Sequence, residues 1–92
     1  MIYPYRNPKV ATRTIDGEAV AVNAQESTLH TLNEVGTFIW ELADGNLSVE
    51  EIADRLTKFY SVEYPEALAD VQAFCQELNQ RKILFLSDAP RH

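Results

Sequence analysis

The stretch that decides the fold lies between residues 32 and 52. It reads Leu32-Asn33-Glu34-Val35-Gly36, then Ile39-Trp40-Glu41-Leu42, then Asp44-Gly45, then Ser48-Val49-Glu50-Glu51-Ile52. Asn33 is a residue type that caps a helix after a strand, and Asp44-Gly45 can end that helix. Ser48, with Glu51 three residues later, forms a capping box that opens a second helix. A short strand that leads into two capped helices favours a small adaptor or winged-helix module, so the question becomes which partner it binds.

Length and charge limit the class of protein. The chain has 92 residues and 46% of them are hydrophobic, enough for one compact core. We expect an extended N-terminal arm over residues 1–9, a single domain over residues 10–86 and a frayed tail over residues 87–92. The net charge of −6 argues against general nucleic-acid binding, which relies on neutralising phosphates. The N-terminus has no signal-peptide pattern and no apolar run is long enough to span a bilayer, so we expect a cytoplasmic protein without a membrane partner.

The first third of the chain predicts an antiparallel meander. Residues 10–15 and 18–23 alternate around Asp16-Gly17, which is typical of a type I′ hairpin turn. A two-residue loop pairs Arg13 with Val20 and leaves Arg13 among apolar side chains, so either Arg13 reaches the sheet margin or the loop is longer. Residues 28–32 predict a third strand. We therefore expect an α+β fold, a three-stranded antiparallel meander followed by three helices, similar to a winged helix.

Apolar stripes with helical spacing predict helices over residues 33–43 and 48–60, and a third that begins near Pro65 and ends near residue 82. Residues 83–86 predict a short strand or an extended tail. The expected core consists of Phe38, Ile39, Leu42, Ile52, Leu56, Val71, Phe74 and Leu78. Trp40 lies off its helix stripe, beside Gly36, and a helical glycine indicates that another element approaches closely. Trp40 either packs in a second core seam, against residues 83–86 or the N-terminal arm, or forms a partner surface.

No constellation of residues indicates catalysis. His30 and His92 are isolated, and the carboxylates are spread over helix ends and ion pairs. Cys75 is the only cysteine, which excludes an internal disulfide, and it lies on an apolar stripe where a thiol stays protonated. The three glycines are too far apart for a phosphate loop. We therefore expect no catalytic residue, no metal site and no cofactor.

The third strand carries the strongest functional signal. In a meander it is an edge strand, and an unpaired edge offers N–H and C=O groups to any extended chain. Leu29 and Thr31 face one side of the sheet, and His30 and Leu32 face the other. The alternatives are that the protein's own C-terminal segment covers this edge, or that a homodimer uses it.

Several segments together resemble the PqqD-like family over about residues 8–86. They are Ile15-Asp16-Gly17-Glu18-Ala19-Val20, Leu29-His30-Thr31-Leu32-Asn33-Glu34-Val35-Gly36, Ile39-Trp40-Glu41-Leu42, Asp44-Gly45, Ser48-Val49-Glu50-Glu51-Ile52, Asp70-Val71 with Phe74 and Leu78, and Ile83-Leu84. The resemblance implies a peptide chaperone, or recognition element, for ribosomally made and modified peptides. Such proteins hold the leader of a precursor peptide and present it to a modifying enzyme, often a radical-SAM protein. The leader adds beside the third strand, in a groove shared with the third helix. The implied peptide-binding residues here are Thr28, Leu29, His30 and Thr31, opposite Ala67, Leu68, Val71 and Cys75.

Two other classes stay open on the sequence. A winged-helix DNA-binding or regulatory protein would also have a hairpin and three helices, but the third helix offers Glu66, Asp70 and Glu77 where a DNA reader needs Arg or Lys. A dimerisation module would use the same strand edge.

Overall fold

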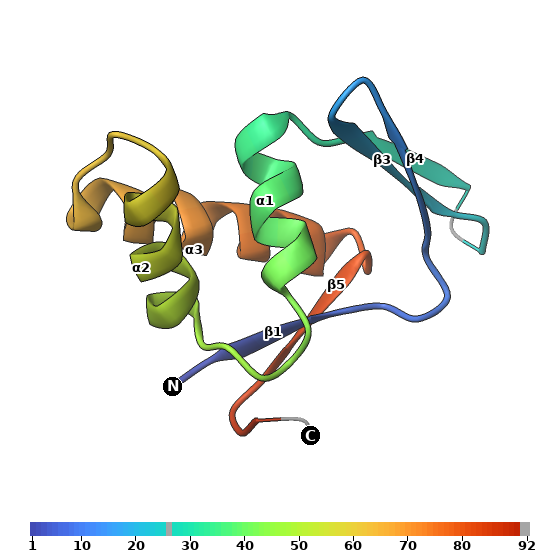
Figure 1. The fold of residues 1–92 in the computed structure, drawn as a ribbon. Helices are drawn as coiled ribbons and strands as arrows, with labels where there is room; N and C mark the ends of the chain where they lie inside the picture. Colours follow the sequence, from blue (N-terminus) through green and yellow to red (C-terminus); the bar gives the residue numbers. More distant parts are fainter. Residues whose placement is uncertain (26, 91–92) are drawn as a thin grey trace.

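The computed structural model describes residues 1–25 and 27–90, with only the backbone of residue 28. In chain order the elements are β1 (Tyr3–Arg6), β2 (Ala11–Ile15), β3 (Glu18–Asn23), β4 (Thr28–Thr31), α1 (Glu34–Leu42), α2 (Val49–Phe59), α3 (Tyr64–Gln80) and β5 (Leu84–Ser87). Figure 1 shows α1 between the three-stranded sheet and α2, with α3 running behind α1. The expected α+β fold is confirmed. None of the described helices is long and apolar enough to cross a bilayer.

The three-stranded sheet has the order β2-β3-β4, and both of its ladders are antiparallel. The hairpin loop has two residues, because Ile15 pairs with Glu18 and Arg13 pairs with Val20. Asp16 and Gly17 have φ angles of 53° and 83°, the positive values that a type I′ turn requires. The expectation of a tight hairpin is therefore confirmed.

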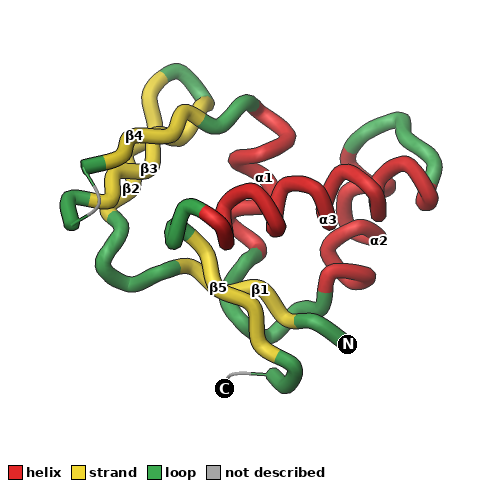
Figure 2. Tube along the Cα trace, turned by 180° about the vertical axis from the view of Figure 1, so that it is seen from behind, coloured by secondary structure: helices red, strands yellow, loops and turns green. Residues whose placement is uncertain are grey.

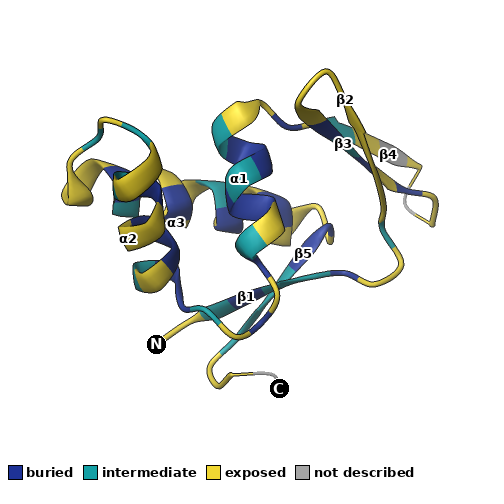
Figure 3. Ribbon diagram, viewed as in Figure 1, coloured by how far each residue is buried: buried dark blue, intermediate teal, exposed yellow. Residues whose placement is uncertain are grey.

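The two faces of this sheet differ in burial, since β3 alternates between buried and less buried residues, while β2 is exposed (Figure 3). Ala19 and Ala21 point toward the helices and are almost fully buried. Arg13 and Ile15 lie on the opposite, outer face, where Ile15 is 55% exposed. Arg13 is therefore exposed to solvent, and its position among apolar side chains of the sheet does not bury its charge.

A second sheet joins the two ends of the chain. β1 pairs antiparallel with β5, with Pro4 opposite Leu86, so the expected N-terminal arm contributes a strand over residues 3–6. The connection between α1 and α2 bonds to the other edge of β1, where the Gly45 N–H donates to the Pro4 carbonyl at 3.0 Å. The expected frayed tail begins inside β5 at Ser87, and its last two residues, 91–92, lie outside the described residues. Figure 2 shows this short sheet separate from the three-stranded one.

The helix ends follow the sequence signals. The Asn33 side-chain oxygen accepts a hydrogen bond from the Gly36 N–H at 2.7 Å. Ser48 and Glu51 form both bonds of the capping box, at 3.1 and 2.9 Å. α3 has Pro65 in its first turn, where proline costs no helical hydrogen bond.

The core lies between the helices and β5 and matches most of the expected set. Ile39, Ile52, Leu56, Val71 and Leu78 are buried, and Phe38, Leu42 and Phe74 are partly buried at its margin. Trp40 is also buried and shares a surface hollow with Arg6, Val10 and Ala19, so it packs toward the N-terminal segment. Its interpretation as a partner surface is wrong.

Candidate functional site

Within the described residues, β4 is an edge strand with one neighbour. It pairs with β3 only, and the C-terminal strand β5 pairs with β1 instead. The protein's own C-terminal strand therefore does not cover the β4 edge. β2 forms the other edge of the same sheet.

The direction of the backbone groups of β4 follows from one hydrogen bond. The Leu32 N–H donates to the Ala19 carbonyl at 2.8 Å, so the backbone groups of Leu32 point toward β3. In an antiparallel ladder every second residue points its N–H and C=O toward the same neighbour. The backbone N–H and C=O groups of His30 therefore also point toward β3, while those of Leu29 and Thr31 point away from the sheet. Two N–H and two C=O groups are thus available at this edge.

The side chains of β4 alternate between the two faces of the sheet. Leu29 is 66% exposed on the outer face, opposite Val22, which is 38% exposed. Thr31 shares that face and is also exposed. His30 is half-buried on the inner face, where its partner is the buried Ala21. The side chain of Thr28 is outside the described part of the structure.

Phe74 brings α3 close to the end of β4. A Cβ placed on Gly36 would lie 3.0 Å from Phe74 Cε1 and 3.5 Å from Leu32 Cβ. The close approach expected at Gly36 is therefore real, and it places Phe74 near the residue that follows β4. Asp70 and Glu77 lie one turn from Phe74 along the helix and are exposed.

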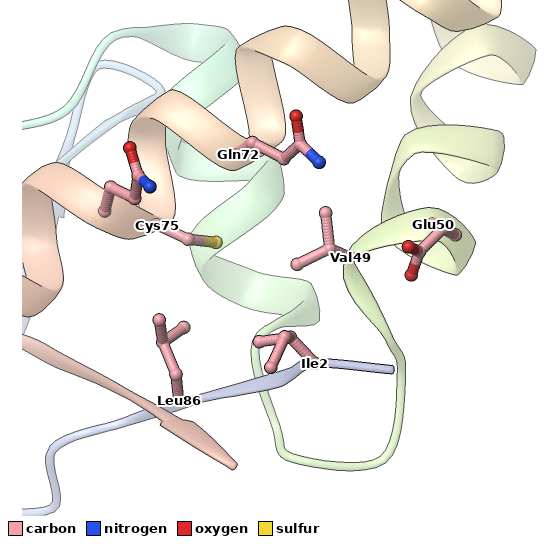
Figure 4. Close-up of a pocket in the computed structure, with 7 residues that line it drawn as sticks. Ile2, Val49, Glu50, Gln72, Cys75 and Leu86 are labelled. Atoms are coloured by element: carbon pink, nitrogen blue, oxygen red, sulfur yellow. The ribbon is translucent and has the colours of Figure 1, made fainter. Parts of the chain in front are cut away.

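The four α3 residues expected at the site do not form one surface beside β4. Ala67 and Val71 have no exposed surface, and Leu68 is partly buried against the core. Cys75 lines a pocket together with Ile2, Val49 and Leu86, on another side of α3 (Figure 4). The burial of Ala67 and Val71 leaves little of the implied helical set exposed toward β4, and its role in peptide binding stays a prediction. Phe74 was assigned to the core from its helical spacing, and its proximity to β4 has no sequence signal apart from Gly36.

Cys75 is not poised to act as a nucleophile. Burial raises the pKa of the Cys75 thiol to about 12, so this thiol is protonated near neutral pH and is a poor nucleophile. Within the described residues, no group of three or more His, Cys, Asp or Glu side chains is arranged to hold a metal ion.

Comparisons with known proteins place the chain among related sequences and folds. A family model described as coenzyme PQQ synthesis protein D (PqqD) matches residues 18–84. The solved structure "TbiB1 in Complex with the TbiA(beta) Leader Peptide" is similar with a TM-score of 0.80 and 31% identity, over 87% of this chain and 93% of that one. "Lasso peptide synthetase B1 complexed with the leader peptide" has a TM-score of 0.79 and 24% identity, over 90% of this chain and 98% of that one, which shows a shared fold. A search of curated proteins found no match.

Proposed function

This chain belongs to the PqqD family, and from that premise we propose that it is a peptide-binding adaptor for the leader of a ribosomally made precursor peptide. The leader adds as a strand along β4, and the adaptor presents it to a modifying enzyme, such as a radical-SAM protein, in the cytoplasm. The observation that carries the proposal is the uncovered β4 edge, with the backbone groups of Leu29 and Thr31 directed outward. The similar TbiB1 structure contains a leader peptide, which supports this class of ligand.

An added strand would place its side chains alternately on the two faces of the sheet. Those on the outer face would lie beside Leu29, which is exposed and apolar. Those on the inner face would lie on the side of His30 and toward the α3 flank that carries Phe74. We therefore propose that the leader lies along Thr28, Leu29, His30 and Thr31, with its backbone bonded to Leu29 and Thr31, and that Phe74, rather than the buried Val71, supplies the helical contact.

The available contacts are sufficient for moderate affinity. Each backbone hydrogen bond contributes a net of about 0.5–1.5 kcal/mol, so four bonds contribute roughly 2–6 kcal/mol. Burial of one or two apolar leader side chains adds about 1.5–3 kcal/mol each. After the cost of ordering the peptide, a Kd near the micromolar range, about −8 kcal/mol, is the expected result.

We propose binding without catalysis, and without DNA as a partner. The protonated Cys75 thiol supports the first statement. The exposed carboxylates of Glu66, Asp70 and Glu77 on α3 support the second, because they would repel phosphate groups.

The proposal is tested by searching beside the gene for this chain for a short reading frame that encodes a precursor peptide. Its fluorescently labelled leader is titrated with the protein, and its core segment serves as the control. We expect anisotropy to report 1:1 binding of the leader near micromolar Kd and no binding of the core segment. Equal binding of both peptides would contradict leader recognition. Size-exclusion chromatography tests the alternative that a homodimer pairs through β4 and blocks this edge. Such a homodimer would elute as a dimer and would dissociate when the leader is added.

A further inference from the structure

Leu29 reverses the usual pattern of a sheet that is covered on one face. In such a sheet, apolar side chains point toward the core and polar side chains point to solvent. β3 follows this rule, because Ala19 and Ala21 are buried on the inner face. β4 does the opposite, since the polar His30 lies on the inner face while Leu29 lies on the outer face and is 66% exposed. The core of the protein therefore gains little from a leucine at this position, and such local conflicts are expected at functional sites.

Leu29 begins a row of apolar side chains across the outer face of the sheet. Its ladder partner on β3 is Val22, which is 38% exposed and pairs in turn with Ala11 on β2. The next row on the same face is mixed, since it begins at Thr31 and ends at Arg13. The row of Leu29 has no charged or hydrogen-bonding side chain, and its open end is the β4 edge. A strand added at β4 would extend this row by one side chain.

We infer that Leu29 forms a binding subsite on the outer face, which takes a large aliphatic or aromatic side chain of the leader. The inference rests on the proposed addition of the leader along β4, and it specifies which leader residues are accepted there. Neighbouring side chains in one row have Cβ atoms about 4.5–5.5 Å apart, so the leader residue beside Leu29 would cover its exposed methyl groups. The apolar surface of both side chains would leave water, which favours binding.

The subsite discriminates between leader residues by charge and by size. A lysine or glutamate beside Leu29 would lose water and find no partner of opposite charge in the row, which is unfavourable. An alanine there would leave Leu29 exposed and gain little apolar contact. The leader residue two positions away would lie beside Thr31, whose hydroxyl and methyl groups suit polar and β-branched neighbours alike. We therefore expect one strictly apolar leader position on the outer face, and a tolerant position two residues away.

The test selects binding peptides from a random library, so it needs no known leader. mRNA-displayed random peptides, long enough to span β4, are enriched on the immobilised protein and, in parallel, on its Leu29→Lys variant. Peptides that pair with β4 are recognised because Thr31→Pro weakens their binding. Among these peptides, we expect one position to be leucine, isoleucine, phenylalanine or tryptophan on the unaltered protein. On Leu29→Lys, we expect aspartate or glutamate at that position, with the preferences two residues away unchanged.

Ile15→Lys is the matched control for Leu29→Lys. Ile15 is also apolar, 55% exposed and on the outer face, but β3 separates its strand from β4. In anisotropy titrations with one labelled β4-pairing peptide, we expect Leu29→Lys to raise the Kd about fivefold and Ile15→Lys to change it less than twofold. Leu29→Ser, which adds no charge, should raise the Kd about threefold. Equal effects of Leu29→Lys and Ile15→Lys would show that only the net charge matters, and would overturn the inference.

The selection separates failure of this inference from failure of the proposed function. Peptides that depend on Thr31 but show the same preferences on the unaltered protein and on Leu29→Lys would overturn the outer-face subsite, and strand addition at β4 would stand. If no enriched peptide depends on Thr31, strand addition at β4 fails and the subsite fails with it.

Discussion

Replacing Thr31 by proline tests whether the leader uses the β4 edge. The Thr31 N–H points away from β3, so proline removes a donor that the free protein does not use for its sheet. One lost backbone bond costs about 0.5–1.5 kcal/mol, and the proline ring also obstructs the approach of the neighbouring strand. A total of about 1–2 kcal/mol corresponds to a roughly 5–30-fold higher Kd. The assay is the anisotropy titration with the labelled leader.

The chain offers a matched control on the opposite edge of the same sheet. Ile15 and Glu18 pair across the hairpin turn, so the backbone groups of Thr14 point away from β3 in the same way as those of Thr31. We expect Thr14→Pro to change the Kd less than twofold, and Thr31→Val, which keeps the N–H, to bind nearly normally. If Thr14→Pro weakens binding and Thr31→Pro does not, the leader uses β2. If neither variant weakens binding, strand addition is refuted.

Four further predictions concern packing, the reactivity and titration of the cysteine, and a helix cap. Gly36→Ala places a methyl group 3.0 Å from Phe74 Cε1, so we expect it to lower the free energy of unfolding by about 1–2 kcal/mol. We expect Phe74→Leu to reduce this loss. Additive effects of the two changes in urea titrations would contradict the contact between them. The Cys75 thiol, with its pKa raised to about 12, should react slowly with a disulfide reagent at pH 8 in native protein and rapidly in guanidinium, and equal rates would show that it is accessible. Because its folded pKa exceeds the ordinary value of 9.0, stability should also fall between pH 9 and 12 more than in Cys75→Ala, and parallel curves would contradict burial of the thiol. Ser48→Ala removes the capping bond to the Glu51 N–H and should cost about 1 kcal/mol in thermal unfolding, whereas an unchanged melting temperature would show that the cap does not stabilise α2.

Local sequence signals predicted most of the fold, because turn conformations and helix caps depend on residues only a few positions apart. Asp16-Gly17 requires positive φ at both positions, and the hairpin register followed from that turn. Asn33 and Ser48 predicted the starts of α1 and α2 because they satisfy helix-terminal N–H groups within three residues. These signals also predicted that β4 is an edge strand, which is the basis of the candidate site.

Features that depend on distant residues could not be predicted in the same way. The β1–β5 pairing joins residues about eighty positions apart, and no local pattern in residues 3–6 specifies that partner. The side of α3 nearest β4 was also missed, because helical spacing identifies a buried stripe but not which neighbour each flank meets. Val71 and Cys75 therefore appeared equivalent to Phe74 in the sequence, although the structure places Cys75 in a separate pocket.

The central claim, leader addition along β4, is tested most directly by hydrogen exchange of individual backbone amides, measured by NMR with and without the leader. The account predicts that the Leu29 and Thr31 amides exchange rapidly in the free protein and become protected in the complex, while the Thr12 and Thr14 amides at the β2 edge keep their free exchange rates. Protection of Thr12 and Thr14, with Leu29 and Thr31 still exchanging rapidly in saturated complex, would contradict it.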